Sequence, residues 1–90
     1  MGKIYKEPKK EEMETTVNVL YNENILSIYT NNVSLQKQLN RLIGEPKNEF
    51  KRKRSIIGSS WDISLDDKSK IQKLILKADI FKYRNENNEW

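Results

Sequence analysis

The stretch TTVNVLYNENILSIYT, residues 15–30, decides how this chain folds. In each half of the stretch, apolar residues alternate with polar or less apolar ones; the alternating apolar residues are Val17, Val19, Leu26 and Ile28. Alternation with a period of two is typical of strands with one buried face. Between the halves, residues 22–24 include two asparagines, which tolerate a left-handed turn. The stretch therefore predicts a β-hairpin with strands near 15–21 and 25–30.

After this hairpin the apolar period changes to that of a helix. Apolar residues recur at helical spacing and form one stripe, made of Leu35, Leu39, Leu42 and Ile43. Asn32 or Ser34 can accept hydrogen bonds from the N–H groups at the helix start. Gly44 suits the left-handed residue that closes a helix, and Pro46 prevents continuation. The pattern predicts a helix over 33–43.

The second half of the chain repeats this order of elements. Phe50 lies in a basic run, and a period of two follows through Ile57, Ser59, Trp61 and Ile63, which we expect on one face. We expect the chain to reverse around Arg54 and Ser55, and Gly58 to mark a bulge or a close backbone approach. A final helical stripe consists of Ile71, Leu74, Ile75 and Ala78. These patterns predict a second hairpin and a second helix.

The predicted element order is β-β-α-β-β-α. Because an isolated hairpin is barely stable in water, we expect one four-stranded antiparallel sheet. Both apolar stripes then cover one face of the sheet, which gives a two-layer α+β domain with a more polar second face. We place this domain at 14–82, after a flexible mixed-charge segment at 1–13 and before a frayed tail at 83–90. Ile4 and Tyr5 are apolar groups of the first segment that can dock on the domain.

The composition excludes most catalytic chemistry. The 90 residues include no cysteine and no histidine, which removes thiolate nucleophiles, thiolate metal sites and imidazole catalysis. Asp62, Asp66 and Asp67 form the one acidic cluster near the predicted core. Ser64 or Asp66 can cap the second helix, and capping and the helix dipole explain Asp66 and Asp67 without a metal. We expect no catalytic residues, no metal and no cofactor. The lack of cysteine in so small a domain favours a cytoplasmic location, and no apolar run reaches the roughly 20 residues of a membrane span.

The excess positive charge lies in one segment. The chain has 17 basic and 13 acidic residues, a net charge of +4, and residues 47–54 alone have five basic residues and one acidic residue, also a net of +4. Positive charge at a hairpin tip attracts phosphate backbones or acidic protein surfaces. The predicted partner-binding residues are the basic residues of this segment and of the second helix: Lys47, Lys51, Arg52, Lys53, Arg54, Lys70, Lys73 and Lys77.

Each of these features also has a purely structural interpretation. Lysine on an edge strand discourages aggregation, and lysines along a helix are commonly a solvated face. Tyr21, Tyr29 and Phe50 are candidates for stacking on nucleic-acid bases, but they can equally cover the sheet or join the core. The sequence leaves these alternatives open.

Four segments also carry a resemblance to known proteins. They are the strand that begins Glu14-Thr15-Thr16, the strand that ends Ile28-Tyr29-Thr30, the helix end Gly44-Glu45-Pro46, and Gly58-Ser59-Ser60-Trp61-Asp62-Ile63. Together they make the chain resemble small uncharacterised proteins of AT-rich Firmicutes and of their phages and mobile elements. The resemblance implies a setting in which small proteins act as regulators or as inhibitors of host defence, including anti-CRISPR proteins.

We therefore expect a non-catalytic binding protein whose partner is an anionic macromolecule. It would act on nucleic acid or on a nucleic-acid-handling protein, with inhibition of host defence as one such role. The alternative is a protein–protein interaction module without nucleic-acid binding. The sequence leaves the oligomeric state open.

Overall fold

The computed structural model of the chain describes residues 3–78 and 80. The main elements are β1 (Thr15–Leu20), β2 (Ile25–Thr30), α1 (Val33–Leu42), β3 (Asn48–Arg52), β4 (Ser55–Ser64) and α2 (Lys68–Lys77). Two short 3-10 helices, η1 (Lys10–Glu12) and η2 (Tyr21–Glu23), flank β1. The α+β class, the four-stranded antiparallel sheet and the two helices predicted from the sequence are confirmed.

The first hairpin forms where the alternating residues predict it. β1 and β2 pair without interruption, from Thr15 opposite Thr30 to Leu20 opposite Ile25. Asn24 closes the turn with a φ of 57°, a left-handed conformation that asparagine adopts more readily than most residues. The turn therefore forms at the residues that the local sequence indicates.

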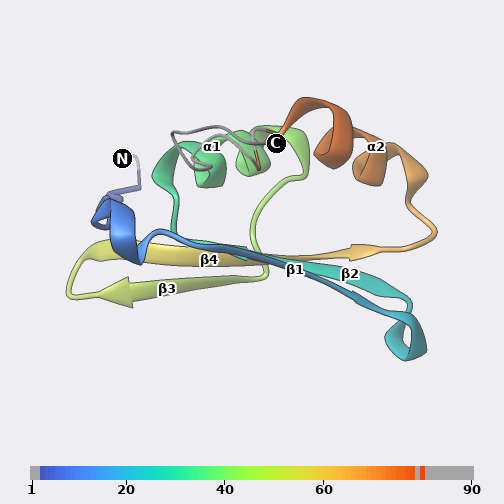
Figure 1. Cartoon of the computed structure of the whole chain (residues 1–90), viewed down its shortest axis with the longest axis horizontal. Helices are drawn as coiled ribbons and strands as arrows, with labels where there is room; N and C mark the ends of the chain where they lie inside the picture. The colour runs from blue at the N-terminus through green and yellow to red at the C-terminus, as the bar shows by residue number, and fades with distance from the viewer. Residues whose placement is uncertain (1–2, 79, 81–90) are drawn as a thin grey trace.

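The four strands lie in the order β1-β2-β4-β3, so the two hairpins join through β2 and β4, and β1 and β3 are the edges. Both helices lie over the same side of the sheet (Figure 1). Residues of β2 and β4 are buried in alternation, with Ile28 and Trp61 opposite each other on the helix side. Tyr29 and Ser60, also opposite each other, lie on the other side, which we call the helix-free face.

The core lies between the sheet and the helices. Its buried apolar side chains come from β2, β4, α1 and α2, and they are Leu26, Ile28, Leu35, Leu39, Trp61, Ile63 and Leu74. Trp61 is 1% exposed, and its indole Nε1 donates a hydrogen bond to the Gly44 carbonyl at 2.8 Å. Gly44 has a φ of +123°, which side-chain-bearing residues rarely adopt. The end of α1 is therefore tied directly to the centre of the sheet.

The helix starts confirm one predicted cap and correct another. Asn32 caps α1 by accepting a backbone N–H, as expected. For α2 the prediction of Ser64 or Asp66 was wrong, because Asp67 is the residue whose side chain accepts the backbone N–H of the first turn. Ser64 instead accepts the N–H of Asp66 and shapes the turn before the helix. Ile75, expected in the apolar stripe, is 67% exposed.

A β-bulge changes the face predicted for β4. Phe50 lies opposite Gly58 but Lys51 lies opposite Ile56, so Ile57 is an extra residue on β4. The extra residue reverses the alternation beyond it. As a result Ile56 is 2% exposed, whereas Ile57 is only half-buried and lines a pocket on the helix-free face. The expectation that Ile57 continues the buried face of β4 was wrong for this reason.

The N-terminal segment occupies the position beside β4 that β2 leaves vacant. The Ile56 N–H donates to the Ile4 carbonyl at 2.7 Å, and the Lys6 N–H donates to the Ile56 carbonyl at 3.0 Å. On the helix side, the Tyr5 hydroxyl accepts a hydrogen bond from Asn40 of α1 at 2.9 Å. Tyr5 therefore docks on the domain, while Ile4 remains 59% exposed.

The described residues include most of the segment predicted before the domain and none of the tail predicted after it. Residues 3–13 contact the domain through the bonds above, and the flexibility expected for 1–13 stays a prediction. The frayed tail expected at 83–90 lies outside the described residues. Within the described part of the chain, no helix is long and apolar enough to cross a membrane.

Candidate functional site

The basic run forms the tip of the hairpin between β3 and β4. β3 ends at Arg52, residues 53 and 54 make the turn, and β4 begins at Ser55. Residues 51–54 are all exposed, and none of them forms an ion pair with a described residue. Lys53 has a φ of 58°, a left-handed conformation that is uncommon for a residue with a side chain. The tip therefore presents four neighbouring cations to solvent.

Lys47 belongs to a different arrangement. Its Nζ lies 2.8 Å from Oδ2 of Asp62, and this hydrogen bond raises the Lys47 pKa above its ordinary value. Glu49, the one acidic residue of the basic segment, pairs with Lys3 of the N-terminal segment. Glu49 is therefore paired with Lys3 and does not neutralise the cations of residues 51–54.

The structure separates the lysines of α2 from the hairpin tip. α2 lies in the helix layer and follows the end of β4 opposite to the hairpin (Figure 1). β4 has 10 residues, which corresponds to roughly 30 Å of extended chain. Lys70 lies 3.9 Å from Asp67 of its own helix, and Lys73 and Lys77 are exposed. The lysines of α2 and the hairpin tip therefore lie at opposite ends of β4.

Two aromatic side chains named by the sequence meet on the helix-free face. The rings of Tyr29 and Phe50 are 5.7 Å apart between centroids, with an interplanar angle of 67°. Asn48, on the same side of β3 as Phe50, donates a hydrogen bond to Ser60 at 3.2 Å. Phe50 is 45% exposed, so one part of its ring remains open to solvent. Tyr21 lies apart from this pair, on η2, and is 81% exposed.

Gly58 determines how Tyr29 lies in this pair. A Cβ atom at Gly58 would lie 2.6 Å from the Tyr29 hydroxyl and 2.9 Å from its Cε1, so a side chain there would displace the ring from its position against β4. Burial, with a smaller contribution from Glu14, raises the Tyr29 pKa above its ordinary value. The shift delays ionisation of the hydroxyl to more alkaline pH, and at neutral pH the hydroxyl is protonated, as in any tyrosine, and can donate a hydrogen bond.

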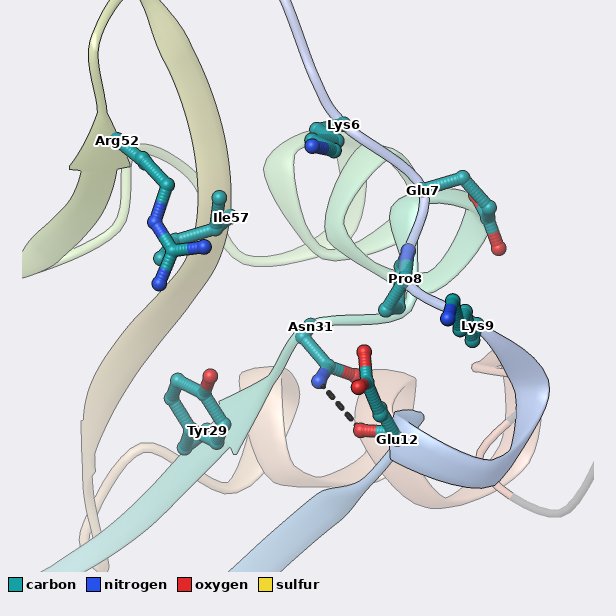
Figure 2. Close-up of a pocket in the computed structure, with 9 residues that line it drawn as sticks. All are labelled: Lys6, Glu7, Pro8, Lys9, Glu12, Tyr29, Asn31, Arg52 and Ile57. Atoms are coloured by element: carbon teal, nitrogen blue, oxygen red, sulfur yellow. Dashed lines mark hydrogen bonds between the residues drawn. The ribbon is translucent and has the colours of Figure 1, made fainter.

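A pocket of about 310 Å³ adjoins the aromatic pair. Figure 2 shows its lining: Arg52 and Ile57 from the basic hairpin, Tyr29 and Asn31 from the end of β2, and Lys6, Glu7, Pro8, Lys9 and Glu12 from the N-terminal segment. Asn31 helps to hold that segment, because its amide donates to the Glu12 carbonyl at 2.9 Å. Three cationic side chains, Lys6, Lys9 and Arg52, thus line one opening together with a tyrosine hydroxyl.

Sequence reasoning missed the contribution of the N-terminal segment. Lys6 and Lys9 stand among glutamates, so the local charge is balanced and gives no signal. The pairing of residues 4–6 with β4 and the bond from Asn31 to the Glu12 carbonyl bring these lysines near Arg52. Among the described residues, no group of three or more acidic side chains is placed to hold a metal ion. Comparison of the chain with protein-family models, with curated proteins and with solved structures found no match.

Proposed function

We propose that this protein binds single-stranded nucleic acid on the helix-free face, beside the basic hairpin. The observation that carries the proposal is the exposed ring of Phe50, supported from one side by Tyr29 and bordered by the tip cations. Aromatic rings on an open sheet face accept unpaired bases by stacking, because every base has a π-face. Such stacking contributes about 1–3 kcal/mol per base.

The charges around the aromatic pair suit a phosphate backbone that passes over the same face. Arg52 follows Phe50 by two residues on β3 and reaches the pocket from the same side. Lys6 lines the pocket from the N-terminal segment, and Lys53 and Arg54 extend the positive charge into the turn. Phosphate contacts of this kind supply affinity without reading sequence, so we expect little sequence preference.

The turn itself supports a binding role for its charge. Glycine or asparagine would adopt the left-handed φ of 58° at position 53 at less cost than the lysine that stands there. Unfavourable backbone conformations cluster at functional sites, so the left-handed φ of Lys53 favours a role for its side chain. A lysine at this position makes the turn less stable than glycine or asparagine would, and it adds a positive charge to the tip.

An acidic protein surface is the competing partner. It would attract the same cations, but it would not require an exposed ring at position 50. Phe50 therefore distinguishes the two partners. The setting implied by the resemblance, a phage or mobile element and inhibition of host defence, stays a prediction, and nucleic-acid binding is compatible with it.

The test is fluorescence anisotropy of labelled oligothymidine and oligouridine strands, with a DNA duplex for comparison. We expect both single strands to bind at low salt, and Phe50→Ala to weaken binding by about 5- to 150-fold, which corresponds to 1–3 kcal/mol. Tyr21→Ala is the matched control, because it removes a more exposed aromatic ring far from the tip and should leave binding unchanged. Absence of single-strand binding at low salt overturns the proposal. Binding that survives Phe50→Ala but depends on the tip cations would overturn the stacking role of Phe50 and leave only phosphate contacts.

A further inference from the structure

The two edges of the sheet differ in how they are protected. β1, at one edge, consists of Thr15–Leu20 and contains no charged residue, no proline and no glycine. β3, at the other edge, contains Glu49, Lys51 and Arg52 and leads into the basic turn. Natural proteins usually blunt exposed edges with charges, prolines or bulges, since an open edge can pair with another strand. β1 has none of these features, and its pairing with β2 is free of bulges.

The hydrogen bonds at the end of β1 show which of its backbone groups point outward. The Asn31 N–H donates to the Glu14 carbonyl at 3.3 Å, which makes this pair a hydrogen-bonded one. Inward bonding alternates along an antiparallel strand, so Thr16, Asn18 and Leu20 bond to β2. The N–H and C=O groups of the remaining residues, Thr15, Val17 and Val19, therefore face away from the sheet.

The outward edge also has an apolar row. Val17 and Val19 lie opposite Ile28 and Leu26, so they belong to the helix side of the sheet. Their β2 neighbours are 0% and 8% exposed, but Val17 and Val19 are 42% and 43% exposed. Val17 and Val19 therefore combine partly exposed side chains with backbone N–H and C=O groups that point away from the sheet.

We propose that β1 pairs antiparallel with β1 of a second copy of this chain. With a two-fold axis at Val17, the three outward residues of each strand face one another: Val17 opposite its own counterpart, and Thr15 opposite the second copy's Val19. All three pairs are then hydrogen-bonded. An axis perpendicular to the sheet joins the two four-stranded sheets into one and keeps both helix layers on the same side.

Charge favours a second copy as the occupant of this edge. Each chain has a net charge of +4, and the exposed cations of residues 51–54 lie at the β3 edge, three strands away from β1. Joined through β1, the two β3 strands are about 33 Å apart at the usual spacing between strands, far beyond the Debye length of about 8 Å at physiological salt. Pairing through β1 therefore keeps the basic hairpins of the two copies at the two ends of the joined sheet, whereas pairing through β3 would place Lys51 and Arg52 of the two copies on neighbouring strands.

The joined sheet would also place both helix-free faces on one side, with a basic hairpin at each end. The dimer does not rest on nucleic-acid binding, and either can exist without the other. A single pair of six-residue strands is a small interface. We therefore expect dissociation in the micromolar-to-millimolar range that is typical of weak association.

Sedimentation velocity of the full chain between about 10 µM and 1 mM tests the dimer in this expected range. The weight-average mass should rise from 10.7 kDa toward twice that value. Val17→Lys places two lysines against each other at the axis and should raise the dissociation constant at least about tenfold. Ile75→Lys is the matched control, because it makes the same kind of change at a 67% exposed apolar residue on α2 and should leave the mass unchanged.

Amide exchange of the unmodified chain gives a second readout that needs no variant. The Val17 and Val19 amides should exchange quickly at low concentration and slowly at high concentration, whereas Thr16 and Asn18 should be slow at both. A chain that stays monomeric at 1 mM, with no concentration dependence at these amides, overturns the proposal. Loss of the dimer in Ile75→Lys but not in Val17→Lys would also overturn it and would move the interface to α2.

Discussion

At the scale of single residues, Trp61 connects more of the molecule than any other side chain described above. It lies on β4 opposite Ile28 of β2, and its indole N–H bonds the carbonyl of Gly44 at the end of α1. The side chain is 1% exposed, so both its volume and its one polar group are used inside the protein. This placement confirms that Trp61 is a core residue and not a platform for a ligand.

Trp61→Ala should lower the free energy of unfolding by about 3–5 kcal/mol, because it opens a large cavity and leaves the Gly44 carbonyl without its donor. Trp61→Phe keeps most of the ring volume and loses mainly the hydrogen bond, so it should cost clearly less. Urea unfolding followed by circular dichroism measures both. If the two variants are equally destabilised, the hydrogen bond rather than the packing dominates, contrary to this prediction.

At the scale of elements, β4 contacts three other segments of the backbone along its length. It pairs with β3 on one side, and with β2 and then the Ile4–Lys6 backbone on the other. The bulge at Ile57 lies between the part of β4 that pairs with β2 and the part that bonds to the N-terminal segment. The hairpin tip therefore stands beyond the core, where its side chains contribute little to packing.

Reversing the tip charges with Arg52→Glu, Lys53→Glu and Arg54→Glu should change stability little, because exposed substitutions usually stay within about ±0.5 kcal/mol. The same triple variant should strongly weaken single-strand binding. It should also reduce the slope of log K against log salt by about 0.7 for each phosphate group that the variant no longer neutralises. Anisotropy titrations at several salt concentrations measure both effects.

The matched control reverses three lysines of α2, with Lys70→Glu, Lys73→Glu and Lys77→Glu. It changes the net charge by the same amount at the opposite end of β4, so a general charge effect would weaken binding equally in both variants. We expect the α2 variant to bind better than the tip variant. Equal loss in the two would show that total charge, and not the hairpin, governs binding.

At the scale of the whole molecule, three titrating groups of the described residues make stability depend on alkaline pH. The pKa of Lys3 is raised by its hydrogen bond with Glu49, that of Lys47 by its hydrogen bond with Asp62, and that of Tyr29 by burial. In each case the folded protein holds the proton more tightly than the unfolded chain does. The stabilisation is therefore complete below the ordinary values of 10.0 for tyrosine and 10.5 for lysine, and it is lost as pH rises through the folded values.

The urea midpoint should accordingly stay nearly constant between about pH 6 and 9, since the chain has no histidine, and fall above about pH 10. Lys47→Met removes one of the three groups and should make the alkaline fall shallower. A marked loss of stability between pH 6 and 9 would contradict the assignment, because none of these three groups titrates there.

Local sequence determined the elements whose signals lie within a few residues. The alternation around Asn24, the stripe that ends at Gly44 and the turn near Arg54 depend on backbone preferences and on side-chain period, which act between neighbours. Trp61 could be assigned to the core for the same reason. The basic tip was also visible, because four cations stand together in the chain.

Tertiary structure alone decided which distant groups meet. The bulge exchanged Ile57 for Ile56, because register depends on how two strands pair and not on either strand alone. Phe50 and Tyr29 became neighbours only through the order β2-β4-β3, in which β4 brings one strand of each hairpin to its two sides. Charge pairing follows the same rule: Lys47 is neutralised by Asp62 across the sheet, and Lys6 reaches the pocket because its backbone bonds to β4. Composition records how many charges the chain has, but the strand order determines which of them remain exposed for a partner.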